Sequence, residues 1–195
     1  PSGADSWDRL YRLTLASERP WETEQADADL LAALDRAVEG PGAVLEIGAG
    51  LGTLALAAAR RGHRVVATDV AEAALAQASA RAGAESVFWI EDDITRTRLR
   101  GRFDVILDRG CLHLLDELGA ERYAGAVARL ARPGGALILK TISDASVPGI
   151  TAYDEQRVRA RFGATFTLES MIGSELAGPQ GARSASLFVL RRRRD

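Results

Sequence analysis

The sequence predicts an α/β fold: a seven-stranded, mostly parallel sheet with helices on both faces and an antiparallel last strand. Short β-rich runs alternate with alanine- and leucine-rich stretches, which is the pattern of right-handed βαβ units around a parallel sheet. The strand runs are nearly continuous in apolar residues, as expected when helices cover both faces. The last two runs have no helix between them, so we expect them to pair as an antiparallel hairpin.

The expected elements follow one another in a regular order. Strands are expected at residues 43–47, 64–68, 86–90, 103–107, 136–141, 165–172 and 184–190. Helices are expected at residues 27–39, 51–61, 71–82, 120–131 and 152–162. Turn-forming residues support these limits: Pro41-Gly42 precedes the first strand, residues 132–135 form a turn before the fifth, and residues 177–181 turn the hairpin.

Composition narrows the class of protein. A chain of 195 residues favours one domain. The 25 basic and 27 acidic residues give a net charge of −2, so no charge excess points to a nucleic acid partner. Arg191 to Arg194 are interpreted as a solvated end after the last strand. The single cysteine, Cys111, excludes an intrachain disulfide and fits a reducing compartment. No run approaches the roughly 20 apolar residues that span a bilayer, and no signal-peptide pattern is seen, so we expect a cytoplasmic location without membrane contact.

The most informative segment joins the first strand to the next helix and reads Glu46-Ile-Gly-Ala-Gly-Leu-Gly52. Glycine permits backbone angles and close ligand approach that a Cβ would block, and ligands of open α/β sheets bind outside the carboxyl ends of the strands. A dinucleotide loop would need glycine where the sequence has Thr53. The Glu46 carboxylate would repel a pyrophosphate but suits a cationic ligand. A glycine turn that only connects strand to helix is the alternative.

Acidic residues end the next two strands. Asp69 lies 21 residues after Gly48 and can accept hydrogen bonds from both hydroxyls of an adenosine ribose. Taken alone, it would more commonly cap the helix that follows. Asp92 and Asp93 end the third strand, where one carboxylate can accept from an adenine amino group while Ile94 packs on the ring.

With these features the sequence resembles the class I S-adenosylmethionine-dependent methyltransferases, which have a Rossmann-like sheet. The resemblance extends from Trp7 to Leu190 and includes Pro133-Gly134-Gly135 before the fifth strand. It implies S-adenosyl-L-methionine as cofactor, with the glycine loop under the methionine part, Asp69 on the ribose, and Asp93 with Ile94 on the adenine. The cofactor-binding residues expected from this resemblance are Trp21, Glu46, Gly48, Ala49, Gly50, Asp69, Val70, Asp93, Ile94 and Asp108; no metal ligand is expected.

The resemblance also implies a division of the chain. We expect residues 1–195 to form a single methyltransferase domain. Residues 1–40 would supply an N-terminal lid and a helix, residues 41–145 the cofactor-binding half, and residues 146–195 the C-terminal helix and hairpin.

A narrower likeness lies in the fourth strand. The segment Phe103-Asp-Val-Ile-Leu-Asp-Arg-Gly-Cys-Leu-His113 is similar to a signature of the thiopurine and small-thiol methyltransferases and their tellurite-resistance relatives. Pro20-Trp21 is similar to a segment of the same group in which tryptophan helps enclose the cofactor. Leu114 stands where many of these relatives carry a second histidine, so a histidine-pair role does not transfer.

Candidate catalytic residues follow the fourth strand: Asp108, Arg109 and His113. Asp108 and Arg109 could orient or deprotonate an acceptor, or hold an anionic one through the guanidinium; the alternative is a salt bridge or a capped turn. His113 is interpreted either as packed in the core or as a base that faces the substrate. We expect Cys111 to be a buried apolar residue and His63 to lie on the surface.

The predicted function is methyl transfer from S-adenosylmethionine to a small-molecule acceptor, at a thiol or selenol, because a thiolate needs little help from a base. The N-terminal aromatics, among them Trp7 and Tyr11, would form a lid or merely staple the N-terminus to the sheet. The acceptor site would lie between this lid, residues 108–113 and residues 142–153, without an obligate protein partner. The alternatives are O- or N-methylation of a natural-product or metabolite scaffold, and a non-catalytic S-adenosylmethionine-binding module.

Overall fold

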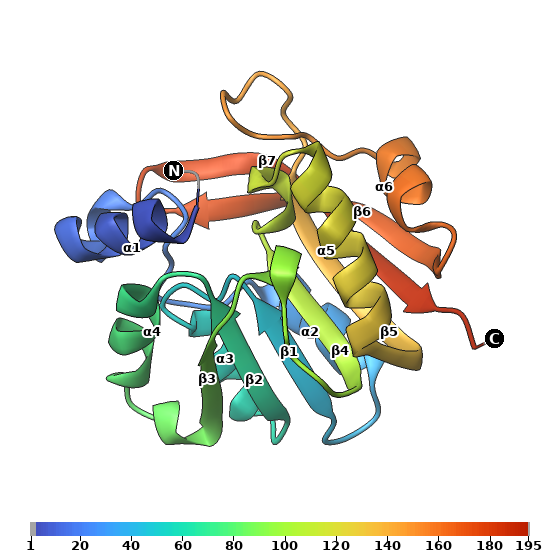
Figure 1. Cartoon of the computed structure of the whole chain (residues 1–195), viewed down its shortest axis with the longest axis horizontal. Coiled ribbons are helices and arrows are strands. Elements are labelled where there is room, and N and C mark those ends of the chain that lie inside the picture. The colour runs from blue at the N-terminus through green and yellow to red at the C-terminus, as the bar shows by residue number, and fades with distance from the viewer. Residues whose placement is uncertain (1–2, 195) are drawn as a thin grey trace.

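A computed structural model describes residues 3–194 and confirms the predicted fold. Over these residues the strands form one seven-stranded sheet in the order β3-β2-β1-β4-β5-β7-β6 (Figure 1). Strands β1 to β5 run parallel, and β7 is antiparallel to both β5 and β6. The strands are β1 Ala43–Ile47, β2 Arg64–Asp69, β3 Val87–Glu91, β4 Phe103–Arg109, β5 Ala131–Ile142, β6 Phe166–Gly178 and β7 Gly181–Arg192.

Helices cover both faces of the sheet. The α-helices are α1 Ala4–Leu13, α2 Ala28–Ala37, α3 Thr53–Ala59, α4 Glu72–Ser79, α5 Glu117–Leu130 and α6 Glu155–Phe162. Apolar side chains of α2 and α3 pack on one face in one buried cluster. Those of α5 and α6 pack on the other face in a second cluster, and Figure 1 shows α5 lying across β4 and β5. Burial on both faces explains why the central strands are apolar throughout.

The N-terminal helix α1 packs beside α4 rather than on the sheet. Helix α4 begins after Ala71, whose side chain cannot cap it. Asp8 of α1 supplies the missing acceptor, because its Oδ1 accepts a hydrogen bond from the Ala73 N–H at 2.7 Å. The position of α1 is therefore fixed by a helix end that needs a partner.

Some local expectations were wrong. The predicted turn at residues 132–135 forms the irregular start of β5, where the register shifts against β4. The hairpin strands are longer than predicted, so that Arg191 and Arg192 lie within β7. His63, expected on the surface, is buried, and its Nδ1 accepts from the Gly42 N–H at 3.1 Å. Over residues 3–194, no helix is long and apolar enough to span a membrane.

The aromatic packing under α6 gives a test of the fold. Phe162 is 2% exposed and its ring meets those of Tyr123 and Phe166 edge-on, with centroids 6.3 and 6.2 Å away. We predict that Phe162→Ala lowers the free energy of unfolding by about 3–5 kcal/mol, because it leaves a cavity in the core. Urea denaturation measures this change. Phe88→Ala is the control, since Phe88 is 70% exposed and its loss should cost no more than about 0.5 kcal/mol. Equal effects of the two substitutions would contradict the assigned packing.

Candidate active site

The glycine loop closes tightly after β1. The Ala49 N–H donates to the Thr68 carbonyl, and the Gly52 N–H donates to the Ala49 carbonyl, both at 2.8 Å. Gly48 and Gly50 have φ angles of 66° and 54°, in the left-handed region that favours glycine. A Cβ at Gly48 would lie 2.9 Å from the Cβ of Cys111, and one at Gly50 would lie 2.8 Å from the Tyr11 hydroxyl. The loop therefore needs glycine at both positions.

A narrow cleft of about 50 Å³ opens beside this loop. Five of the predicted cofactor residues line it, and Arg109 of the predicted catalytic set does so as well. The lining residues are Tyr11, Trp21, Glu22, Thr23, Ala26, Glu46, Gly48, Ala49, Gly50, Thr53, Leu54 and Arg109. The structure thus brings the loop, the end of β4 and the N-terminal segment together around one space.

Glu46 supplies the main electrostatic feature of the cleft. Its side chain is 3% exposed, and burial raises the pKa of the carboxyl to about 8, so it is neutral at pH 7. Its Oε2 is buried without a hydrogen-bond partner among residues 3–194. Because an unpaired buried oxygen is costly, a cationic ligand in the cleft would be stabilised there. The cleft therefore fits a ligand with an ammonium or sulfonium group.

Asp69 holds the loop in place. Its Oδ2 accepts from the Gly50 N–H and its Oδ1 from the Ala71 N–H, both at 2.9 Å, and burial raises its pKa. These two hydrogen bonds and a ribose-binding role are compatible, since each carboxylate oxygen has a second lone pair. Val70, the next predicted residue, is half-buried.

The two aspartates at the end of β3 differ in their hydrogen bonds: Asp93 has partners, and one oxygen of Asp92 has none in the described chain. Asp93 accepts from the Thr95 N–H at 2.9 Å and from the Arg96 Nε at 2.9 Å. Burial would raise the pKa of Asp93, but these hydrogen bonds outweigh it and lower the pKa. Asp92 Oδ2, in contrast, is buried without a partner in the described chain. Ile94 is buried in the cluster under α5. Of the two carboxylates that the sequence offered for an adenine amino group, Asp92 therefore keeps a free acceptor oxygen, and the adenine-binding role of either residue stays a prediction.

At the end of β4, Asp108 is fully buried and caps the turn that follows. Its carboxylate accepts from the Cys111 N–H at 2.7 Å and from the Leu112 N–H at 3.0 Å. Burial raises the pKa of Asp108 to about 6. Cys111 is half-buried, and burial raises the pKa of its thiol. Asp108 does not line the cleft.

His113 is also tied to the backbone. It is buried, and its Nδ1 accepts from the Ile142 N–H at 3.1 Å. Burial lowers the pKa of the imidazole to about 4, so the ring is neutral at pH 7. The His113 carbonyl accepts from the Thr151 N–H at 2.8 Å. His113 therefore fastens both ends of the segment after β5.

Arg109 has three partners. Its Nε donates to Asp27 Oδ2, its Nη1 to the Trp21 carbonyl and its Nη2 to the Ala177 carbonyl, each at 2.8 Å. Beneath it, Lys140 of β5 donates to Asp27 at 3.0 Å and to Asp29 at 2.9 Å. Sequence analysis did not assign Lys140, Asp27 or Asp29. The available signal was a single lysine within the apolar fifth strand.

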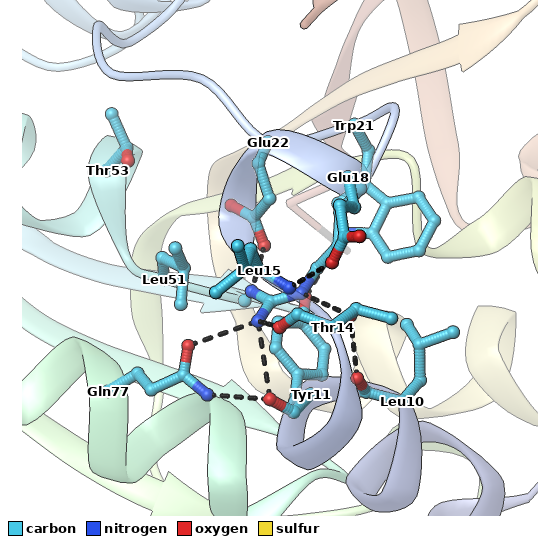
Figure 2. Close-up of polar contacts among 12 residues, drawn as sticks. Leu10, Tyr11, Thr14, Leu15, Glu18, Trp21, Glu22, Leu51, Thr53 and Gln77 are labelled. Carbon is cyan, nitrogen blue, oxygen red and sulfur yellow. Dashed lines mark hydrogen bonds and ion pairs between the residues drawn. The ribbon is translucent and has the colours of Figure 1, made fainter.

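The N-terminal part predicted as a lid folds as α1 and the segment 14–23, which we call the lid segment. Arg19 is 2% exposed, lies over the Tyr11 ring at 4.3 Å, and donates to the Thr14 carbonyl at 2.7 Å and to Gln77 at 3.2 Å. Figure 2 shows Tyr11, Thr14 and Gln77 converging on this point. The Trp21 Nε1 donates to the Tyr11 hydroxyl at 3.2 Å. Tyr11 and Trp21 thus hold the N-terminal segment together and also line the cleft.

The arginines at the chain end lie at the opposite edge of the sheet, near Gly134 and Thr167. Arg191 pairs with Glu169 at 3.0 Å and also contacts the Ala37 and Gly134 carbonyls. Arg192 and Arg193 each donate to a backbone carbonyl. These three arginines are thus engaged with the fold and are not a free basic tail.

Comparisons with known proteins give a domain match and a set of structures with the same fold. Residues 44–135 match the family described as "Methyltransferase domain". A structure from work on the conversion of a disulfide bond into a thioacetal group during echinomycin biosynthesis is 26% identical, with a TM-score of 0.83 over 98% of this chain and 94% of the other. The 1,6-didemethyltoxoflavin-N1-methyltransferase of Burkholderia thailandensis is 22% identical, with a TM-score of 0.79 over 97% and 87%. The N-methyltransferase NodS of Bradyrhizobium japonicum is 19% identical, with a TM-score of 0.77 over 98% and 99%.

The fold, the glycine loop and the domain match define a Rossmann-like methyltransferase. Residues 44–135 form a methyltransferase domain, and the cleft beside the glycine loop fits S-adenosylmethionine as the cofactor. The unpaired Glu46 oxygen and the close approach permitted at Gly48 and Gly50 fit this cationic cofactor. The roles of individual residues stay predictions, and the next two experiments test them.

We predict that Asp69→Ala weakens the binding of S-adenosylhomocysteine by about 1.5–3 kcal/mol, the range for hydrogen bonds to a charged group. Titration calorimetry measures the affinity. Asp35→Ala is the control, because it removes an exposed carboxylate of α2 that lies outside the cleft. Unchanged affinity in Asp69→Ala would remove Asp69 from the ribose site.

Glu46 should couple cofactor binding to a proton. Its carboxyl is neutral below a pH of about 8, and a bound cation favours the ionised form. Binding of S-adenosylmethionine at pH 7 should therefore release a proton, and affinity should rise as the pH increases toward about 8. Calorimetry in two buffers of different ionisation enthalpy measures the release. Glu46→Gln should lose it, whereas equal proton release in both proteins would exclude Glu46 as its source.

Proposed function

We propose that the enzyme methylates the sulfur or selenium atom of a small molecule that carries a thiol or selenol. The main observation for this proposal is that the two candidate bases after β4, Asp108 and His113, are buried and hydrogen-bonded to backbone N–H groups. Asp108 is fully buried and accepts two backbone N–H groups, and the His113 Nδ1 is occupied by another. A thiolate forms near neutral pH without such a base, whereas an alcohol or phenol needs one more often.

Two carboxyl groups line the cleft, those of Glu22 and Glu46, and both lie beside the glycine loop. Glu22 Oε1 lies 3.5 Å from the position of a Cβ on Gly50, and Glu46 ends β1 beside the same loop. Burial raises the pKa of Glu22, and that of Glu46 reaches about 8. In this proposal both side chains stabilise positive charge on the ligand and neither deprotonates the acceptor.

When bound, S-adenosylmethionine supplies an electrophilic methyl group on a sulfonium. The protein's own contribution is then alignment and exclusion of water. Trp21 and Glu22 wall the cleft from the lid side, and Asp108 fixes the turn that carries Cys111. We infer that the acceptor lies between the lid, residues 108–113 and residues 142–153. The two contacts of His113 bring the last two segments together.

Two likenesses support sulfur as the acceptor atom. The fourth-strand segment and Pro20-Trp21 resemble the thiopurine and small-thiol methyltransferases. The structure at 26% identity comes from work on a reaction that converts a disulfide bond into a thioacetal group. The two N-methyltransferases are less than 25% identical and share the fold. N-methylation is therefore an outcome that the test must distinguish.

The acceptor class is tested by measuring release of S-adenosylhomocysteine with matched thiols, selenols, phenols and amines. We predict turnover with thiols and selenols at least 100-fold above that with phenols and amines, about the contribution of a general base. Preferred turnover of an amine or phenol would contradict the proposal. So would binding of S-adenosylmethionine without turnover of any acceptor.

His113→Asn tests the absence of a base. Asparagine keeps a carbonyl oxygen that can accept from the Ile142 N–H, but it cannot take a proton at neutral pH. With a thiol acceptor we predict a loss in kcat of less than about tenfold, because the thiolate forms without the imidazole. A loss of about 10²–10⁴-fold with thiols would instead identify His113 as a general base. Steady-state kinetics with saturating cofactor measure the difference.

A further inference from the structure

We propose that Arg109 and Lys140 act with Asp27 and Asp29 as a latch, which holds the lid segment 14–23 closed over the cofactor cleft. In this proposal Arg109 is a positioning residue for cofactor binding, and it acts through the lid rather than on the acceptor. The inference concerns cofactor affinity, so it stands apart from the identity of the acceptor.

The contacts of Arg109 join three separate parts of the chain. One nitrogen pairs with Asp27 ahead of α2, and the other two donate to the carbonyls of Trp21 in the lid and Ala177 in the hairpin, all at 2.8 Å. Two of the three acceptors are backbone oxygens. Arg109 therefore fixes the path of the lid backbone whatever the side chain there. Each nitrogen of the guanidinium has a partner, so three of its five N–H groups are used in these contacts.

The charges beneath Arg109 are paired, and those of Lys140 and Asp27 are nearly buried, whereas the Asp29 side chain is 29% exposed. Lys140 is 3% exposed and bridges Asp27 and Asp29, so two positive and two negative groups balance. Asp29 also accepts from the Ser174 hydroxyl of β6. Asp27 precedes α2 but makes no side-chain cap for that helix, because its carboxylate is directed to the two cations. Removal of one member would leave a buried charge unpaired, which strongly favours rearrangement.

The β6–β7 hairpin also contacts the lid segment directly. A Cβ at Gly178 would lie 1.7 Å from the Pro20 carbonyl oxygen, so the two backbones are in direct contact. Gln180 at the hairpin turn donates to the Glu18 carbonyl at 3.3 Å. The lid segment is thus held by β4 and the hairpin, while Arg19 anchors its other side to α4 through Gln77.

The held segment is the one that walls the cleft. Trp21, Glu22 and Thr23 all line the cleft, and the carbonyl oxygen of Trp21 accepts a hydrogen bond from Arg109. If the latch opens, these side chains lose their place against the glycine loop, and the cofactor loses one wall of its site. The cost should therefore fall on cofactor affinity, and catalysis at saturating cofactor should be nearly normal.

The test compares Arg109→Lys and Lys140→Met with Arg122→Lys. Lysine at position 109 can keep the pair with Asp27 but cannot reach both carbonyls, since it lacks the guanidinium fork. Methionine at position 140 keeps the length of the stem without the charge. Arg122 is exposed on α5 and serves as the matched control. Calorimetry gives the affinity for S-adenosylhomocysteine, steady-state kinetics give kcat, and hydrogen exchange reports on residues 15–23.

We expect Arg109→Lys to weaken S-adenosylhomocysteine by about tenfold or more, equivalent to one lost charge-assisted hydrogen bond. We expect faster exchange in residues 15–23 but not in α5, and kcat within about threefold of the wild type at saturating cofactor. Lys140→Met should change the same quantities in the same direction, and Arg122→Lys should change none. Normal cofactor affinity in both latch variants, or a fall in kcat without a fall in that affinity, would overturn the proposal.

Discussion

The site depends on the burial of carboxylates at the carboxyl edge of a parallel sheet. Asp69 and Asp108 each accept two backbone N–H groups, and these hydrogen bonds offset the cost of leaving water. Glu46 keeps an unpaired oxygen and a pKa raised to about 8 by burial. The satisfied carboxylates shape the loops, and the unsatisfied one favours a cationic ligand. Asp69 and Asp108 thus hold the loops around the cleft, and Glu46 is the residue that we predict to favour a cationic cofactor.

The fold could be predicted because most of its strands are marked by patterns within short stretches of sequence. Each strand from β1 to β4 is a short apolar run bounded by turn residues, and the glycine loop fixes where the ligand edge lies. The start of β5 could not be predicted this way. Pro133 and the glycines after it are typical of a turn, but pairing with β4 draws residues 131–135 into the sheet with a shifted register. The strands of the hairpin are longer than predicted for a similar reason, because β6 and β7 pair with each other beyond the apolar core.

The lining of the cleft could be predicted in part, and the contacts of Arg109 and Lys140 could not. Five of the ten predicted cofactor residues line the cleft, namely Trp21, Glu46, Gly48, Ala49 and Gly50. For Arg109 the sequence left two interpretations open, a residue that faces the acceptor or a salt bridge, because spacing cannot show that its partners lie 88 and 68 residues away. Asp27 and Lys140 meet across 113 residues. Such pairs are set by tertiary structure, and only an unexpected charge in an apolar strand signals them.

In the proposed reaction the acceptor supplies its own nucleophile, and the residues after β4 position the loops around the site. The pH dependence of kcat/KM for a series of small thiols of different pKa distinguishes this from base catalysis by the protein. We expect the inflection of each profile to follow the pKa of the thiol used. An inflection at one fixed pH for all thiols would reveal a titrating base on the protein and would exclude a reaction without such a base.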